Sequence, residues 1–423
     1  MQLSANRWLK ISLFNLLVVA FIGVILRYKI AFPLPFVNQK YLLHAHSHFA
    51  FSGWISQALM TLLVAYLHRH SHLFAFKKYK WLLYGNLVAA YGMLFSFPFQ
   101  GYALFSIIFS TLSIFIAYAF AVIYWKDINK IKQKNIGHHW IKAALLFNAI
   151  SSIGAFSLAF MMANKIAGEH LYLCAVYFFL HFQYNGWFFF ACIGLFYSWL
   201  AQQGIQHKQQ KLIFWLFALA CVPSYFLSAL WLPIPMWVYV LVVMAAFAQV
   251  TGWILVIKNI RQHLKIFSVI VRVGKILWCL SAIALSLKLL LQLASTVPSL
   301  SKLTFGFRPI VIGYLHLVLL GVITLFIIGF AYTNHIINLN RQTKFGTAVF
   351  TSGIIVNEIL LMTQGIAAIN YNSVPYINEM LFGAALVMFS GLLIIVSAQQ
   401  TVQHIDKSYN FFEGSVLYDF DHR

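Results

Sequence analysis

Histidines are the residues of this sequence best suited to chemistry, and three of them occupy alternate positions. His44, His46 and His48 lie in the segment HAHSHFAFSGW, which becomes apolar at once. His181 and His316 lie inside other long apolar runs. An ionisable side chain inside a membrane-length apolar segment is costly, so each of these residues is a candidate functional group. Imidazole is also the commonest metal ligand in proteins, which makes metal or haem binding the first chemistry to consider.

The spacing of the first three histidines limits what they can do together. His44 and His48 are four residues apart and share a helix face, whereas His46 points nearly opposite. One regular helix therefore cannot bring all three to a single ion. One of them as an axial ligand of a haem iron, with the others at the rim, is easier to build, and His316 supplies the second imidazole. The small and aromatic residues of FAFSGW and GYLHLVLLG would form the slot for the macrocycle.

The composition indicates the elements that must position these side chains. Of 423 residues, 62% are hydrophobic and only 9% are charged, which is typical of a polytopic membrane protein. We predict an all-α, polytopic membrane protein, folded as one transmembrane domain over 1–423 with a short cytoplasmic tail over 400–423. A span needs about 20 apolar residues. The chain offers twelve such runs, at 9–27, 43–67, 80–97, 101–125, 140–163, 170–199, 211–230, 236–257, 275–294, 309–331, 346–365 and 378–398.

The basic residues predict the orientation of these spans. Most of the 29 Lys and Arg lie in the N-terminal segment and the even-numbered loops. By the positive-inside rule both termini are cytoplasmic, in a membrane that we take to be the bacterial inner membrane. The net charge of +21 could also suggest a nucleic-acid partner, but its carriers lie in short loops between spans, so we expect none. The 4 cysteines lie inside apolar runs and indicate neither a disulfide framework nor a zinc site.

The orientation places the intramembrane histidines at similar depths. Spans two, six and ten all run from the outer to the inner side. At 1.5 Å per residue, His48 lies roughly 7 Å inside the bilayer, His316 about 10 Å and His181 about 16 Å. Three separate helices thus bring imidazoles into the outer half of the membrane.

This pattern resembles the catalytic subunit of the haem–copper oxidase superfamily. In that family spans two and ten each give one axial ligand of a low-spin haem, and span ten carries H-x-H. Here span ten reads YLH, so His316 matches the low-spin position and Tyr314 stands at the high-spin position. Span six reads HFQYNG, similar to the H-x-x-x-E-G pattern of the nitric-oxide-reductase branch. His181 then matches a ligand of the non-haem metal, with Asn185 in place of the glutamate.

The sequence also departs from the family pattern. Span seven of the family contributes a His-His pair to the copper or non-haem iron, and KLIFWLFALACVPSYFLSALW contains no histidine. The resemblance therefore implies a bis-histidine low-spin haem of unspecified type and an incomplete ligand set for non-haem copper or iron. Oxidoreductase activity of the terminal oxidase or nitric oxide reductase type stays an open question, as does the substrate, dioxygen or nitric oxide. The electron donor would be quinol or cytochrome c, and partner subunits would be expected.

A second resemblance fits two stretches. The haem-binding nitric-oxide-response membrane proteins (NnrS family) have a span that opens with H-A-H before an aromatic, small-residue run. HAHSHFAFSGW is similar to that span, and YLHLVLLGVITL is similar to their later histidine-bearing span.

Two further ionisable residues lie deep in spans. Glu358 and Lys288 both lie about 18–20 Å from the cytoplasmic side, where they could pair or serve a proton path. Together with His181 they leave a proton-coupled transporter as an alternative to a haem protein, although the two halves of the chain show no clear similarity. A non-catalytic scaffold subunit is the third alternative.

Overall fold

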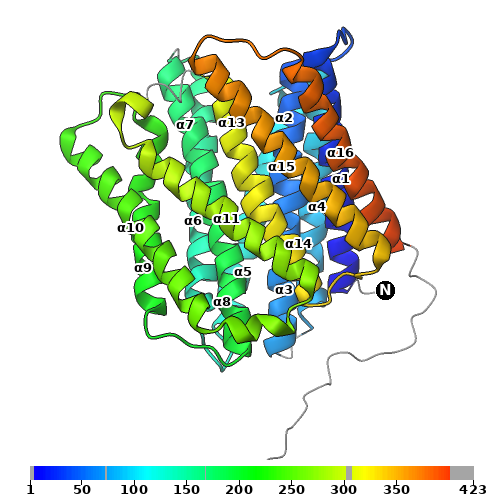
Figure 1. Cartoon of the computed structure of the whole chain (residues 1–423), viewed down its shortest axis with the longest axis vertical. Helices are drawn as coiled ribbons and strands as arrows, with labels where there is room; N and C mark the ends of the chain where they lie inside the picture. Colours follow the sequence, from blue (N-terminus) through cyan, green and yellow to red (C-terminus); the bar gives the residue numbers. More distant parts are fainter. Residues whose placement is uncertain (1–3, 72–73, 167, 302–306, 401–423) are drawn as a thin grey trace, which may run out of the picture.

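The computed structural model describes residues 4–71, 74–166, 168–301 and 307–400, so the predicted tail lies outside the described residues except for its first position. Within these ranges the chain is helical and contains no strand. The helices run up and down along a common direction, and successive ones are joined by short connections (Figure 1). The predicted all-α class is confirmed.

The element bounds are as follows. The α-helices are α1 (Ala5–Ala31), α2 (Gln39–Phe49), α3 (Gln57–Ser71), α4 (Ala75–Gln100), α5 (Leu104–Ile128), α6 (Gly137–Ala163), α7 (Glu169–His181), α8 (Phe189–Gln202), α9 (Gln210–Cys221), α10 (Met236–Gln262), α11 (Arg272–Ala294), α13 (Arg308–His316), α14 (Leu325–Thr333), α15 (Arg341–Ile369) and α16 (Ile377–Gln400). Segments η1 (Ala50–Ser56), η2 (Phe182–Phe188) and η5 (Leu317–Thr324) are π-helical, and η3 (Pro223–Ala229) and η4 (Leu264–Val269) are 3-10 helices.

Many of these helices are long and apolar enough to cross a membrane. The described residues contain 10 such helices, or 11 if α9 and η3, which meet at a bend of 43°, are counted as one broken span. The α7–η2–α8 run is continuous from Glu169 to Gln202, but its middle carries His181, Gln183 and Asn185, which lower its hydropathy. The membrane-spanning character is thus confirmed, and the count of twelve spans stays a prediction.

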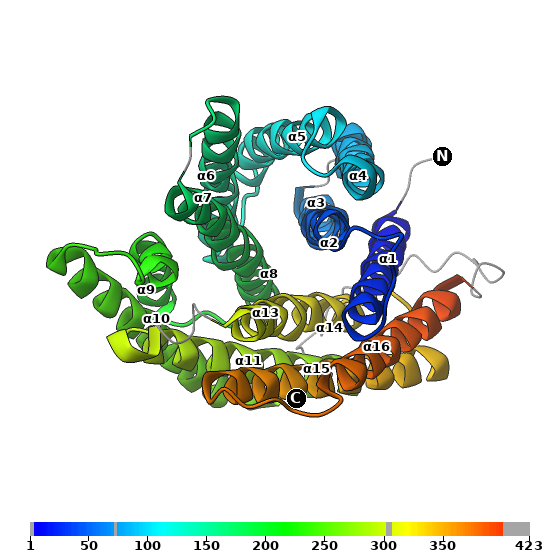
Figure 2. The ribbon, with the colours of Figure 1, turned by 90° about the horizontal axis from the view of Figure 1, so that it is seen from above.

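The histidine-bearing runs lie toward the interior of the bundle (Figure 2). In the most apolar part of the Gln39–Ser71 run 78% of the residues are buried within the protein, against 11% for α5. The side chains of Trp54 and Trp187 are both about 1% exposed and belong to one large apolar core. The outer helices present apolar side chains outward, as a lipid-facing surface requires, whereas the π-helical segments and the helices that follow them, α3, α8 and α14, are largely buried within the protein.

Local sequence signals define the start of α2 and the end of α4. The Asn38 side chain accepts hydrogen bonds from the backbone N–H groups of Lys40 (3.0 Å) and Tyr41 (3.1 Å), which caps α2 just before the three histidines. The α4 helix continues through Pro98 and ends before Gly101, whose φ of 60° suits glycine. A Cβ at Gly101 would also lie 2.5 Å from the Tyr41 ring, so this turn is packed against the start of α2.

Candidate functional site

Each of the three histidine-bearing runs changes from α-helix to π-helix at or next to its histidine. The π-helical segment η2 begins directly after His181, and η5 begins directly after His316. Segment η1 begins two residues after His48. π-Helical turns are rare and occur mostly at functional sites. Because a π turn adds a residue to the turn, it changes the direction of every side chain before it relative to those after it, which here sets where the histidines point.

The three π-helical segments are joined in the interior, and we call η1, η2 and η5 together the π junction. The Trp54 indole N–H donates to Thr324 Oγ1 at 2.9 Å, which joins η1 to η5. The Trp187 indole N–H donates to Ser56 Oγ at 3.1 Å, which joins η2 to η1. Segments η2 and η5 also pack against each other. Hydrogen bonds in an apolar interior fix the relative rotation and height of three separate spans, and so of the histidines above them.

Among the span-two histidines, His46 is the one within electrostatic range of His316. The two imidazoles are close enough to interact electrostatically. The His46 ring lies against α1, where a Cβ added at Gly23 would be 3.4 Å from its Cε1. Its buried Nδ1 has no well-formed hydrogen bond within the described residues, although the Val19 backbone lies beside the ring. His46 therefore occupies the boundary between α1, α2 and α13.

His316 is held in a defined tautomer. Its Nδ1 donates to the Ile312 carbonyl oxygen at 2.8 Å, an acceptor on the preceding turn of α13. A carbonyl can only accept, so the proton is on Nδ1, and no hydrogen bond to Nε2 is found within the described ranges. This is the arrangement that a metal-ligating histidine usually shows, with the outer nitrogen free to coordinate.

The other two histidines of span two face a different neighbour. His48 Nε2 is hydrogen-bonded to the Tyr102 hydroxyl at 2.9 Å, and its ring stacks on Phe97 with centroids 4.6 Å apart. The His44 ring meets Tyr102 edge-on at 4.7 Å. His44 and His48 therefore form an aromatic cluster with the end of α4 and the connection to α5. As expected, His44 and His48 share one face of the helix, and His46 lies on another face.

Arg27 is a neighbour of the histidine pair that the sequence did not single out. This guanidinium on α1 interacts electrostatically with His46, with His316 and with Glu358 of α15. The Asn357 side-chain amide donates to a Glu358 carboxylate oxygen at 3.1 Å. We call His46, His316, Arg27 and Glu358 the imidazole site. Arg27 looked like a loop residue in the sequence because it stands near the end of the first apolar run.

His181 lies in a second buried cluster, where both of its ring nitrogens are already engaged. Its Nε2 donates to the Cys221 carbonyl oxygen at 2.8 Å, and the Asn185 amide donates to its Nδ1 at 3.1 Å. Lys288, 6% exposed, interacts electrostatically with His181 and with the Cys221 thiol. Within the described ranges no group of three or more His, Cys, Asp or Glu could hold a metal ion.

Glu358 and Lys288, which the sequence suggested as a possible pair, lie in different clusters. Glu358 belongs to the imidazole site and Lys288 to the His181 cluster, and no ion pair joins them in the described part of the chain. Tyr314 lies between the clusters, since its ring is 6.3 Å from that of Tyr184 on η2 while its own helix carries His316. Tyr314 is thus next to span six, whereas no Glu358–Lys288 ion pair is found among the described residues.

The sequence of this chain was compared with protein families and with curated proteins. No protein-family model matches the sequence, and no curated protein matches it. The function is therefore argued from the imidazole site, the His181 cluster and the π junction.

Proposed function

We propose that this chain is an integral membrane haem protein that transfers electrons, with His46 and His316 as the two axial ligands. The observation that carries the proposal is that imidazoles from two different helices lie within electrostatic range of each other and of one arginine. Bis-imidazole ligation of haem needs two such rings and an apolar slot. The resemblance of the histidine pattern to haem–copper oxidases and to the NnrS family agrees with this assignment, as does the predicted set of twelve spans.

The residues of the imidazole site fit a haem in three respects. The Nδ1–H of His316 is engaged by Ile312, so Nε2 is the coordinating atom. Gly23 leaves space beside the His46 ring that a larger side chain would fill. Arg27 is positioned to pair with a propionate carboxylate, and the Glu358 carboxyl lies within electrostatic range of the Arg27 guanidinium. Haem would supply a one-electron couple, and this chain would hold, orient and tune it.

The available metal ligands favour electron transfer or a response to a gas over the reduction of dioxygen. Both axial positions of the haem would be taken by histidine, and the His181 cluster offers no complete ligand set for copper or non-haem iron in the part of the chain described. Displacement of one imidazole by nitric oxide would give an NnrS-like response, whereas electron entry would require a quinol or cytochrome c donor. The membrane is taken to be the bacterial inner membrane, with both termini cytoplasmic.

An optical spectrum tests this proposal directly. Purified, dithionite-reduced protein should show sharp α and Soret bands of low-spin haem. His46→Ala and His316→Ala should each abolish the low-spin signal. His44→Ala and His48→Ala are matched controls, because they remove an imidazole from the opposite face of the same helix. A colourless preparation from haem-supplemented cells, or an unchanged spectrum in His316→Ala, would contradict the proposal.

A proton-coupled transporter is the second candidate, favoured by one observation. Lys288 is buried and lies within electrostatic range of Cys221, where α9 ends at its break with η3. Broken helices and intramembrane charges mark the binding sites of many transporters. A colourless protein whose Lys288→Met variant binds ligand or moves protons differently in proteoliposomes would favour this candidate. An intact haem spectrum with unaltered proton movement would exclude it.

A further inference from the structure

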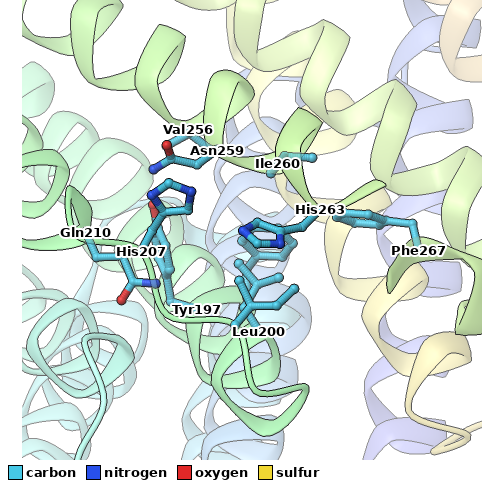
Figure 3. A pocket seen from close by; sticks show the side chains of 11 residues that line it. Tyr197, Leu200, His207, Gln210, Val256, Asn259, Ile260, His263 and Phe267 are labelled. Atoms are coloured by element: carbon cyan, nitrogen blue, oxygen red, sulfur yellow. The ribbon is translucent and has the colours of Figure 1, made fainter. Parts of the chain in front are cut away.

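A cavity with polar walls lies beside span two, and its lining includes His48 but not His46. Its walls come from α2 with η1, α4, α5, α6 and η2, which stand around a common centre in the view from above (Figure 2). We call it the ring cavity. Its volume is about 70 Å³, room for roughly two waters at about 30 Å³ each. The pocket shown in Figure 3 has only about 20 Å³, and its accessible surface is almost entirely apolar.

One wall of the ring cavity carries a buried amide whose oxygen is free. Asn86 on α4 lines the cavity and is 4% exposed. Its Nδ2 donates to the Ser52 carbonyl oxygen at 3.0 Å and to Gln57 Oε1 at 2.7 Å, which uses both of its hydrogens. Its Oδ1 accepts no hydrogen bond in the described residues, yet this atom is not sealed from a small guest. Asn86 therefore offers the cavity an acceptor.

The opposite wall repeats this arrangement with a second amide. Gln183 on η2 lines the cavity and is 7% exposed. Its Nε2 donates to Asn148 Oδ1 at 2.9 Å and to Ser151 Oγ at 2.8 Å, so both hydrogens are again engaged. Its Oε1 accepts no bond from any described residue and, like Asn86 Oδ1, stays accessible. A nearly buried acceptor without a partner costs free energy, and in native proteins such groups usually bond to water or a ligand.

The remaining polar groups of the wall also present oxygen atoms. Four serines each donate their hydroxyl proton to a carbonyl oxygen on the preceding turn of their own run, namely Ser52, Ser113, Ser151 and Ser152. Among the described residues that line the cavity there is no Asp, Glu, Lys or Arg. A cation would thus lack a counter-charge inside an apolar bundle, which is costly. The walls suit a small, neutral guest that donates hydrogen bonds.

We propose that the ring cavity binds a small cluster of water molecules, which donate hydrogen bonds to Asn86 Oδ1 and Gln183 Oε1 and hydrate the interior of the bundle. Water has the required size and two hydrogens to donate, and the site offers it several polar partners. The cavity also borders the π junction, since Ser56 and Trp187, which are hydrogen-bonded to each other, both line it. The inference does not depend on haem binding, because it uses neither His46 nor His316.

Hydroxyl-radical footprinting of the purified full-length protein with X-ray pulses tests this assignment. Radicals form from water at the place where the water is, so a side chain beside bound water is oxidised even when bulk solvent cannot reach it. Trp187 lines the cavity and Trp54 does not, although both are 1% exposed. We expect Trp187 to be oxidised on the order of tenfold faster than Trp54, because polar cavities are hydrated and apolar interiors are dry. Equal rates would show a dry cavity and overturn the proposal.

Two kinds of variant should remove the waters by different means. Asn86→Leu with Gln183→Leu deletes the two free acceptors, and Ala117→Leu fills the cavity from α5 while leaving both amides in place. Each should lower the oxidation rate of Trp187 to that of Trp54. Gln249→Leu is the matched control, because Gln249 is a buried amide, 5% exposed, that does not line the cavity.

The control variant should leave Trp187 oxidation unchanged. Fast oxidation of Trp187 that persists in Ala117→Leu would place the water elsewhere and contradict the site. The footprint is also recorded in sodium, potassium and choline chloride at equal ionic strength. The same rates in all three salts are expected for bound water. Protection of Trp187 by sodium or potassium, with no protection by choline, would identify a bound cation and overturn the assignment to water.

Discussion

At the scale of single residues, identical side chains a few positions apart have different surroundings. His46 packs against α1 within electrostatic range of His316, whereas His44 and His48 contact Tyr102 and Phe97. Helical periodicity predicts that His46 differs from the other two. It does not predict which face meets the second histidine, because that depends on which helices flank α2.

The charges of the imidazole site should tune the reduction potential of a bound haem. Arg27→Gln removes a positive charge and should lower the midpoint potential, whereas Glu358→Gln should raise it at a pH at which the Glu358 carboxyl is ionised. Each shift should be on the order of 50 mV, since charges several ångströms apart interact by about 1–2 kcal/mol in a protein interior. Redox titration followed at the α band measures both.

Glu379→Gln is the matched control for this pair of variants. Glu379 is an exposed carboxylate in the first turn of α16 and has no contact with either histidine in the described residues. Its replacement should leave the midpoint potential unchanged within error. Shifts of the same sign in Arg27→Gln and Glu358→Gln would contradict the assignment of these two charges to the haem environment.

At the scale of elements, the π-helical segments decide how the histidines are presented. Three spans share the succession of α-helix, histidine and π-helix, and indole–hydroxyl hydrogen bonds join the π segments. None of this has a sequence signature, because Trp54 and Trp187 also fit ordinary packing. The extra residue of a π turn is stabilised by contacts between helices, which only the assembled bundle supplies.

Removing a residue from η5 should therefore disturb haem binding. Deletion of Leu320 allows the segment to return to α-helix and turns Thr324 by about 100° relative to His316. Trp54 then loses its partner, and the low-spin bands should be lost or strongly reduced in the optical spectrum. Deletion of Gly204 in the α8–α9 connection, where a Cβ would meet nothing within 4 Å, should keep the spectrum. An unaltered spectrum without Leu320 would show that η5 does not position His316.

The Trp54–Thr324 hydrogen bond should contribute measurably to the stability of the bundle. A double-mutant cycle with Trp54→Phe and Thr324→Val should give a coupling free energy of about 1 kcal/mol, typical of hydrogen bonds between spans. Unfolding in mixed micelles measures it. Trp54→Phe combined with Ser286→Ala is the comparison, because Ser286 bonds to Trp253 instead. If the coupling free energy is the same with Thr324→Val and with Ser286→Ala, the substitutions act on the stability of the whole bundle and the Trp54–Thr324 hydrogen bond makes no specific contribution.

At the scale of the whole molecule, many of the basic residues lie in helix connections at one end of the bundle. The N-terminal end of α1 lies at the same end of the bundle as the connections that carry many of the basic residues (Figure 1). Asp127, with 0% side-chain exposure, lies near that end and binds Lys78 and Lys130 at 2.5 and 3.1 Å. A single end thus concentrates the cations, as the predicted cytoplasmic face requires.

Cysteine labelling in intact cells should establish this orientation. Phe36→Cys, at a position that is 93% exposed in the connection between α1 and α2, should react with a membrane-impermeant thiol reagent from outside. Gly204→Cys, at the opposite end, should react only after lysis. The unaltered chain gives the background, including its exposed Cys279. The reverse pattern would invert the topology and place the basic end outside.

The sequence by itself determined the class of protein and the candidate residues. Apolar run length, the distribution of lysine and arginine, and histidines inside spans are local properties, because the bilayer acts on each span separately. They predict an all-helical membrane protein, and helical periodicity further separates His46 from its two neighbours. They also select every histidine of the two clusters, although they overlook Arg27.

Only the tertiary structure decided which of these residues meet. The partners of His46 and His316, the engagement of both nitrogens of His181, and the separation of Glu358 from Lys288 depend on how helices distant in sequence are rotated against one another. That rotation is set by interhelical contacts such as Trp54–Thr324 and by the π turns that those contacts stabilise. A one-dimensional pattern contains the side chains but not the packing that turns them toward each other.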